Sequence, residues 1–564
     1  MNSSPLPVRA NENVLSRREI EGRIAAGQFI IILDSKVLKL DAWMPYHPGG
    51  QLAIRHMVGR DATDEVNALH SKETRQRMNA FQIGSIHGRW TNFVPPIQGG
   101  HFRHNNPEDD QDADALDSEV SSELSSRPPS PVFDVGDARP GLRRRNSAST
   151  ISSAVSSIPP AAPNPEAHSC VLDARTQKEI LLDQDSYPPL DAIHQDHITQ
   201  KYRALNKRIE AEGLYNCNYF AYAVETLRYS ILFGLFIFCL RSSCFGFAGL
   251  FLGCFWHQLV FTAHDAGHMG ITHDFQKDTC IGIMIADFLG GLSLGWWKRS
   301  HNVHHIMTNS PEHDPDIELM PFFAVSHRFF KSLRSTYYDR VMEYDAVSKC
   351  VVKYQNYLYY PILLFGRFNL YYLSWEHIIL DLLRPGKNRA VRWFPWLELT
   401  GQLFFWCWFG YGVCYLSIPT WFDRVLFVLI SHMVTAPLHV QITLSHYAMS
   451  TADLGVHESF AQKMLRTTMD VDCPTWLDFF HGGLQFQAIH HLYPRIPRHN
   501  LRKTQHLVRE FCEDVQIPYA VFTFVDGNKK VIGKLGDIAK QAKILEECQK
   551  ACASQGVFSD HHAH

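Results

Sequence analysis

HDAGH at residues 264–268, HNVHH at 301–305 and QAIHH at 487–491 are the three short stretches that decide what this chain can be. Residues i, i+3 and i+4 share one face of a helix. Each stretch can therefore direct two or three metal-binding side chains toward one point. The residues concerned are His264, His268, His301, His304, His305, Gln487, His490 and His491.

The number of histidines in these clusters indicates more than one metal ion. Neutral imidazole suits iron, copper, zinc and nickel, and seven histidines exceed the four ligands of a tetrahedral zinc. With 31 histidines among 564 residues, chance supplies about 1.7 H-x-x-x-H pairs but only about 0.1 H-x-x-H-H triples. We therefore predict two metal ions that share the set, iron if the chemistry involves oxygen, rather than scattered surface histidines.

Length and composition narrow the class of protein. The 564 residues are enough for three regions, and a net charge of −3 does not indicate a nucleic-acid partner. The N-terminus, MNSSPLPVRANENV, lacks an apolar signal core, so we expect no cleaved signal peptide. The 13 cysteines form no CxxC pair and no CxxCH haem-attachment motif. This usage favours a reducing, cytosol-facing location over a disulfide framework.

Residues 1–95 are expected to form a small mixed α/β module. GQFIIILDSKVLKL (27–40) is short, β-branched and interrupted by Asp and Ser, as strands joined by a turn are. The HPGG tetrad at 47–50 predicts a tight turn that presents His47 and lets a flat ligand approach the backbone.

HPGG, then GRDAT at 59–63 and then His70, resembles the cytochrome b5 haem domain over nearly the whole module. The resemblance implies an α+β fold with His47 and His70 as the axial ligands of haem b. Two imidazoles fill both axial positions, which favours electron transfer over oxygen binding. The alternative is a similar fold without haem that binds a steroid or a protein. His56 lies off the pattern, and we expect it on the surface.

Residues 96–187 are predicted to be a disordered linker. They are acidic and rich in Ser and Pro, so they cannot bury enough apolar area to offset their ordering entropy. Such a tether would hold the haem module near its acceptor at high effective concentration. Arg143–Arg145 before Ser147 resemble a kinase site, although a solvated charge run explains them equally well. Residues 531–564 are expected to be a tail, including His561, His562 and His564.

Residues 188–530 are expected to be an all-α membrane domain. A bilayer-spanning helix needs about 20 apolar residues, and aromatic residues gather at the edges of several apolar segments, as they do at membrane interfaces. We predict four spans, with the histidine clusters on the same side as the haem module, at 222–240, 242–262, 397–418 and 425–444.

Two further apolar segments are not expected to span. Residues 281–297 are short, Gly-rich and contain Asp287, and a span there would place HDAGH and HNVHH on opposite sides of the membrane. We therefore predict an interfacial or re-entrant piece. Residues 354–383 mix aromatic and charged side chains, which is typical of an amphipathic element lying in the membrane plane.

Together, the three clusters resemble the histidine boxes of membrane fatty-acyl and sphingolipid desaturases. Gln487 resembles the first residue of the third box in the front-end group, whose members are fused to cytochrome b5. The surrounding residues 296–326 and 478–502 resemble fungal Δ8-sphingolipid desaturases. Many front-end enzymes have Ile-Glu where this chain has Ala488-Ile489, and this departure favours the sphingolipid branch over a plain fatty-acyl enzyme.

This resemblance implies an oxidoreductase that uses O2 to place a Δ8 double bond in the long-chain base of ceramide. It implies two non-haem irons held by the boxes, a haem b fed by NADH–cytochrome b5 reductase, and a multi-pass protein of the endoplasmic reticulum membrane with its N-terminus and boxes in the cytosol. It also makes His446 a candidate metal ligand. Asp265, Asp314 and Asp316 are candidates to orient the ligands, since metal-bound imidazoles usually need a partner.

Three alternatives stay open at this point. A front-end fatty-acyl desaturase would act at Δ5 or Δ6. A lipid hydroxylase would also join cytochrome b5 to a histidine-rich membrane domain, although Gln487 argues against it. A non-catalytic haem-binding membrane receptor would contain haem iron but no other iron. The position of the double bond comes from the resemblance, because no spacing in the sequence reveals it.

Overall fold

The computed structural model describes residues 13–104, 165–384 and 391–554. The chain divides into two compact units, one formed by 1–105 with 179–542 and the other by 106–178 with 543–564. The N-terminal module, the three histidine clusters and His446 all lie in the first unit. The predicted kinase site at Ser147, most of the linker and the histidines at 561–564 lie outside the described residues.

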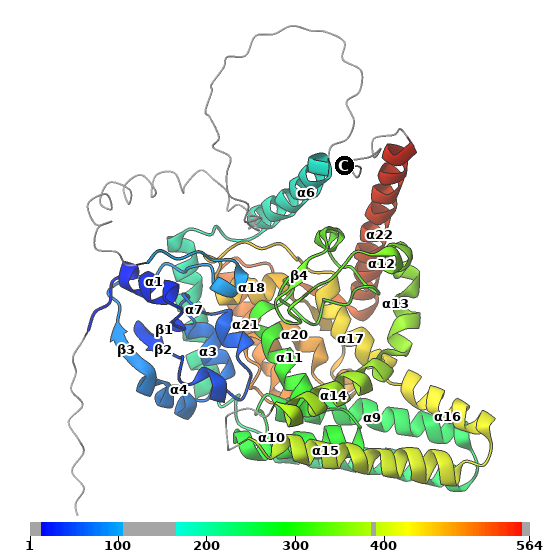
Figure 1. The fold of residues 1–564 in the computed structure, drawn as a ribbon. Helices are drawn as coiled ribbons and strands as arrows, with labels where there is room; N and C mark the ends of the chain where they lie inside the picture. Colours follow the sequence, from blue (N-terminus) through cyan, green and yellow to red (C-terminus); the bar gives the residue numbers. More distant parts are fainter. Residues whose placement is uncertain (1–12, 105–164, 385–390, 555–564) are drawn as a thin grey trace, which may run out of the picture. The chain divides into compact units, whose positions relative to one another are not determined.

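The N-terminal module has the α+β fold expected of it (Figure 1). Its three antiparallel strands lie in the order β1-β2-β3. Asp34 and Ser35, both with positive φ, form the tight turn between the first two strands. The module's elements are α1 (Arg17–Ala25), β1 (Ile30–Leu33), β2 (Lys36–Lys39), α2 (Leu52–Arg55), α3 (Thr63–Leu69), α4 (Lys72–Met78) and β3 (Gln82–Ser85).

Beyond the N-terminal module the described residues are mainly helical, with two short two-stranded sheets besides. Its helices are α7 (Ala192–Ala211), α8 (Tyr219–Arg241), α9 (Phe245–Gly267), α10 (Phe275–Ile283), the π-helix η5 (Met284–Leu289), α11 (Leu294–Met307), α12 (Ala346–Val352), α13 (Gln355–Leu364), α14 (Gly366–Leu383), α15 (Phe394–Phe405), the π-helix η7 (Trp406–Ser417), α16 (Trp421–Met433), α17 (Ala436–Tyr447), α18 (Phe460–Thr467), α19 (Asp478–His481), α20 (Gln487–Leu492), α21 (Arg498–Asp514) and α22 (Phe524–Ser554).

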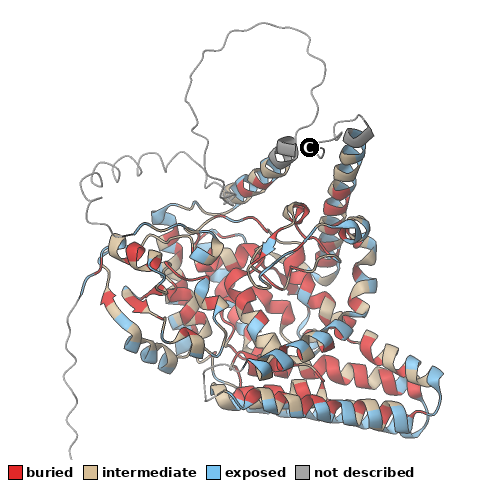
Figure 2. Cartoon of the chain, viewed as in Figure 1, coloured by how far each residue is buried: buried red, intermediate tan, exposed pale blue. Residues whose placement is uncertain are grey.

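Within the part of the chain that the structure describes, three helical segments are long and apolar enough to cross a membrane, namely α8, α9 and the pair α16–α17. They match the first, second and fourth predicted spans. Large apolar side chains of α8 such as Phe220 and Phe238 are exposed, and Figure 2 shows exposed residues along α15 and α16. Such a surface requires an apolar surrounding. The third predicted span divides into α15 and the π-helix η7, so neither helix alone has the length of a span.

The segment predicted to be re-entrant contains a sharp bend. α10 with η5 and the following α11 are bent by 119°. Gly291 lies in the bend with a φ of +69°, and a Cβ there would come within 2.4 Å of the ring of Phe405. Only glycine allows this close approach of α15. The segment predicted to lie in the membrane plane is two helices, α13 and α14.

Two expected boundaries differ from the structure. Residues Pro165–Ser186, within the predicted linker, form helix α6, and Ile180 packs against Ala452 and Leu454. The expected tail from residue 531 is instead a continuation of α22. Val531, Leu535 and Ile538 lie at helical spacing and are buried. In α22 the polar average composition concealed a narrow apolar stripe.

Candidate metal centre and haem site

Four helices bring the predicted metal ligands together (Figure 1). His264 lies in the last turn of α9, and His268 follows that helix directly. The HNVHH histidines lie on α11, whose i, i+3, i+4 spacing puts them on one face. His446 lies in the last turn of α17. His490 and His491 lie on the short helix α20.

The histidines form two groups with metal-site spacing. One ligand atom from each member of the first group lies within 4.8 Å of the others, and the same holds for the second group. The first group is His264, His268, His301 and His490, and the second is His304, His446 and His491. The two groups thus bring together six of the seven predicted histidines with His446.

His305 lies between the two groups. Its ring centre is 4.8 Å from that of His268 and 4.9 Å from that of His490 in the first group, and 4.4 Å from that of His491 in the second. Its Nε2 is 3.1 Å from Nε2 of His301. The two groups are therefore adjacent, as a pair of metal ions sharing one ligand set requires.

The chemistry of these donors fits metal binding. His268 Nε2, His305 Nδ1, His446 Nδ1 and His490 Nε2 are buried and have no hydrogen-bond partner in the described part of the chain. Buried polar atoms normally have a partner, and a metal ion would provide one. Burial and the neighbouring histidines hold the pKa of His490 and of His491 well below its usual value. Both rings are therefore neutral, which is the state that binds metals.

Of the three aspartates expected to orient ligands, Asp314 does so directly. Both its carboxylate oxygens lie 2.9 Å from Nδ1 of His304. Asp316 lies 3.7 Å from Nδ1 of His301, and with His301 and His304 it forms a third possible ligand group. Asp265 lies 4.0 Å from His264 and instead accepts hydrogen bonds from Tyr222 and Arg498. It thereby ties α9 to α8 and α21.

Gln487 is the first residue of α20 and is buried. The same helix supplies His490 to the first group and His491 to the second. The backbone N–H of Ala488 donates to Asp470 at 2.7 Å, which fixes the start of the helix. The role of Gln487 as a ligand stays a prediction.

The predicted haem ligands face each other across a suitable gap. The ring centres of His47 and His70 are 6.0 Å apart, and two imidazoles that each contact an iron atom at about 2 Å place their ring centres roughly 6 Å apart. His47 Nδ1 donates to Gly50 O at 2.7 Å, and His70 Nδ1 lies 3.3 Å from Val66 O. Each Nε2 is thus left for the iron. Burial lowers the pKa of His70 to about 3.

The turn at residues 47–50, which we call the haem-binding turn, lies against α11, the helix that carries HNVHH. A Cβ on Gly49 would be 2.9 Å from Nδ2 of Asn302, the neighbour of His301 on α11. Ile306 and Met307 at the end of α11 belong to the same buried cluster as Leu38 of the haem module. The haem module therefore packs directly on one of the helices that form the metal centre.

This packing corrects the expectation for His56, which is fully buried rather than on the surface. Its Nδ1 pairs with Nε2 of Gln98 at 3.0 Å, and its Nε2 lies 3.3 Å from Oγ1 of Thr336. Its ring centre is 5.1 Å from that of His313. The module's own sequence did not reveal this burial because two of the covering residues, His313 and Thr336, lie more than 200 positions later.

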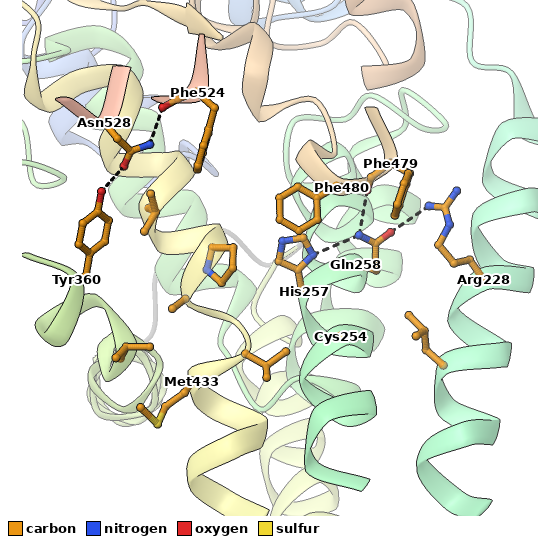
Figure 3. A pocket seen from close by; sticks show the side chains of 16 residues that line it. Arg228, Cys254, His257, Gln258, Tyr360, Met433, Phe479, Phe480, Phe524 and Asn528 are labelled. Atoms are coloured by element: carbon orange, nitrogen blue, oxygen red, sulfur yellow. Dashed lines mark hydrogen bonds between the residues drawn. The ribbon is translucent and has the colours of Figure 1, made fainter. Parts of the chain in front are cut away.

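A cavity of about 900 Å³ lies among α8, α9, α13, α17 and α22 (Figure 3). Most of its lining is apolar, with Phe479, Phe480 and Val440 among its residues. His257 and Gln258 of α9 form a polar edge. The sequence analysis did not find this cavity, because no local pattern indicates which faces of distant helices leave space between them.

Comparison with known proteins agrees with this geometry. Residues 242–523 match the family described as "Fatty acid desaturase", and residues 16–87 match "Cytochrome b5-like Heme/Steroid binding domain". A "Delta 8-(E)-sphingolipid desaturase" of Emericella nidulans is 67% identical over 549 residues, covering 97% of this chain and 98% of the relative. The protein of that name in Candida albicans is 43% identical, covering 97% and 99%. A "Delta(8)-fatty-acid desaturase" of Helianthus annuus is 35% identical, covering 62% and 75%.

Proposed function

Because the chain belongs to the fatty acid desaturase family and carries a fused cytochrome b5-like domain, we propose that it desaturates the long-chain base of a sphingolipid at Δ8, using O2. The observation that carries this proposal is the meeting of eight histidines beside a paired-histidine haem site, with seven in two adjacent groups and His305 between them. The names and the near full-length coverage of the fungal relatives support the choice of a sphingolipid over a fatty acid.

We propose that the two histidine groups hold two non-haem irons, with His305 between them and Gln487 as a further ligand. Once bound and reduced, the irons would supply with O2 the oxidising power that removes two hydrogens from adjacent methylenes, which acid–base side chains cannot do. Asp314 holds the ring of His304 in one orientation. All three members of the second group are buried, as are His268 and His490 of the first group, and this burial limits the access of water to the centre.

The haem module would deliver the electrons. His47 and His70 would hold haem b, and the contact between Gly49 and Asn302 places the haem-binding turn on α11. Such contact shortens the path from the haem to the histidines of that helix. NADH–cytochrome b5 reductase is the proposed source of electrons.

We place the protein in the endoplasmic reticulum membrane as a multi-pass protein, with the N-terminus and the histidine groups in the cytosol. His264 and His446 lie at the C-terminal ends of their spanning segments, so both segments run toward the same side. The haem module packs on α11 at that side. This arrangement gives a cytosolic reductase and its NADH access to the haem.

The cavity is the proposed binding site for part of the lipid. His257 precedes His264 by seven residues on α9, and a helix rises 1.5 Å per residue, so the cavity begins about 10 Å from the first histidine group. Its volume of about 900 Å³ lies in the range of sites for small-molecule ligands.

Expression of the full chain in a fungal host without Δ8-unsaturated long-chain bases tests this proposal. Mass spectrometry of the hydrolysed lipids should detect a long-chain base that is two mass units lighter, with its double bond at Δ8. The His301→Ala variant should give none at equal protein level. New double bonds confined to fatty acids would favour the fatty-acyl alternative instead.

A further inference from the structure

The cavity contains one buried polar atom without a partner. The ring of His257 is 4% exposed and stacks on Phe480, with ring centres 5.1 Å apart. Its Nδ1 lies 3.2 Å from Nε2 of Gln258, whereas its Nε2 has no hydrogen-bond partner among the described residues. Figure 3 shows the ring in the cavity wall with Gln258 on one side. A buried polar atom left unpaired beside a cavity indicates a ligand that pairs with it.

The neighbours of His257 determine what its free nitrogen can do. Arg228 is only a donor, and its Nη1 donates to Oε1 of Gln258 at 3.0 Å. The amide nitrogen of Gln258 must therefore face the other way, where it donates to Phe479 O at 2.9 Å and to Nδ1 of His257. Because Nδ1 of a neutral His257 accepts, its proton lies on Nε2. The free nitrogen is thus a donor, and its ligand must offer an acceptor oxygen.

The distance to the metal centre indicates which oxygen this is. The seven residues from His257 to His264 span about 10 Å of helix α9. An extended hydrocarbon chain advances about 1.25 Å per bond, given single bonds of about 1.5 Å, so this distance equals about eight bonds. In a long-chain base, C1 carries an oxygen, and the Δ8 double bond joins C8 and C9. The oxygen on C1 is thus about as far from the bond that is oxidised as His257 is from His264 along α9.

We propose that Nε2 of His257 donates a hydrogen bond to the C1 oxygen of the long-chain base and so fixes which carbons reach the histidine groups. This inference rests on the proposed function. It makes His257 a specificity-determining residue that selects lipids with an oxygen at the head end over simple hydrocarbon chains. A site that hydrogen-bonds a substrate oxygen discriminates against the analogue that lacks it, because the protein's polar group is then left unpaired.

Membranes that contain the full-length protein would be assayed with ceramide and with 1-deoxyceramide, which differs only in lacking the C1 oxygen. The wild type should prefer ceramide by about tenfold or more, the effect of one buried hydrogen bond. His257→Phe keeps an aromatic ring against Phe480 but has no donor, so the preference should disappear. His257→Gln, whose amide nitrogen reaches a similar point, should keep part of it.

Met433→Leu is the matched control, because it changes the apolar wall of the cavity and no polar group. It should keep the ceramide preference whatever its total rate. The inference is overturned if the wild type converts both lipids equally, or if His257→Phe retains the preference at equal protein and iron content. The first of these results needs no variant to fold. Failure of the wild type to form any Δ8 product would instead overturn the proposed function.

Discussion

At the scale of single residues, Asp314 is the residue that orients a histidine of the metal centre most directly. Its carboxylate is fully buried, accepts from the backbone N–H groups of Asn309 and Asp316, and holds Nδ1 of His304. A carboxylate that fixes a ligand imidazole sets the direction of the opposite ring nitrogen and raises its basicity. Asp314 therefore links a loop to the second histidine group through hydrogen bonds alone.

Asp314→Asn should lower metal affinity and desaturation by about ten- to a hundredfold, the range measured for partners of metal-bound histidines. The amide keeps its size but replaces one acceptor oxygen with a donor that faces other donors. Non-haem iron content and product yield would be measured together. Asp339→Asn, at an exposed position, is the control and should change neither. Normal iron content and normal yield in Asp314→Asn would refute this role.

At the scale of elements, the start of α11 is held by two buried carboxylates. The N–H of Gly295 donates to Glu398 at 2.5 Å, and the N–H of Leu294 donates to Asp287 at 3.3 Å. Ser293 Oγ also donates to Glu398 at 3.1 Å. The first N–H groups of a helix lack partners within it, so acceptor oxygens are favourable there. These contacts tie the helix of HNVHH to α15 and to the bend before it.

Glu398→Ala should leave the N–H of Gly295 without its buried partner, at a cost of about 1–3 kcal/mol, and should lower iron content because α11 is no longer fixed. Glu398→Gln retains an acceptor oxygen and should retain most of both properties. Thermal unfolding in detergent and iron analysis would compare them. Glu376→Ala, at an exposed position of α14, is the control. Equal thermal stability and equal iron content in the Ala and Gln variants would contradict this role of Glu398.

Features that depend on local spacing were predictable from the sequence, whereas features that depend on contacts between distant residues were not. The histidine clusters and the haem ligands were predictable because their spacing is local, within one helix or one turn. The burial of His56, the contact of Glu398 with the start of α11 and the donor state of His257 depend on residues far away in sequence. The apolar stripe of α22 was missed because its average composition is polar, although its spacing was visible.

At the scale of the whole molecule, the haem module is seated on the desaturase part instead of swinging freely. Besides the apolar contact with α11, Arg203 of α7 pairs with Asp64 at 2.7 Å, and Asn92 donates to Val456 O at 2.9 Å. The pair of Asp64 with Arg203 is half buried, so its charge complementarity can fix the orientation of the module.

Reversing the charge at either position, with Asp64→Arg or Arg203→Asp, should slow reoxidation of the haem by substrate and O2 several-fold, because like charges would then meet in the interface. The double exchange should restore most of the rate. Stopped-flow absorbance of the haem band measures this step, and the static spectrum confirms haem binding. Charge reversal of Arg208, which pairs with Glu510 at an exposed site, is the control. If the double exchange does not restore the rate, the haem module does not occupy one fixed position on the desaturase part.

The ratio of iron to haem in the purified full-length protein tests the central claim most directly, namely that the histidine groups form a two-metal centre beside the haem. Metal analysis combined with the pyridine haemochrome spectrum should give three irons per haem. Combined replacement of His304 and His446 by alanine, which takes two of three members from the second group, should lower that number while leaving the haem in place. One iron per haem in the wild type, in protein that desaturates its substrate, would contradict the account.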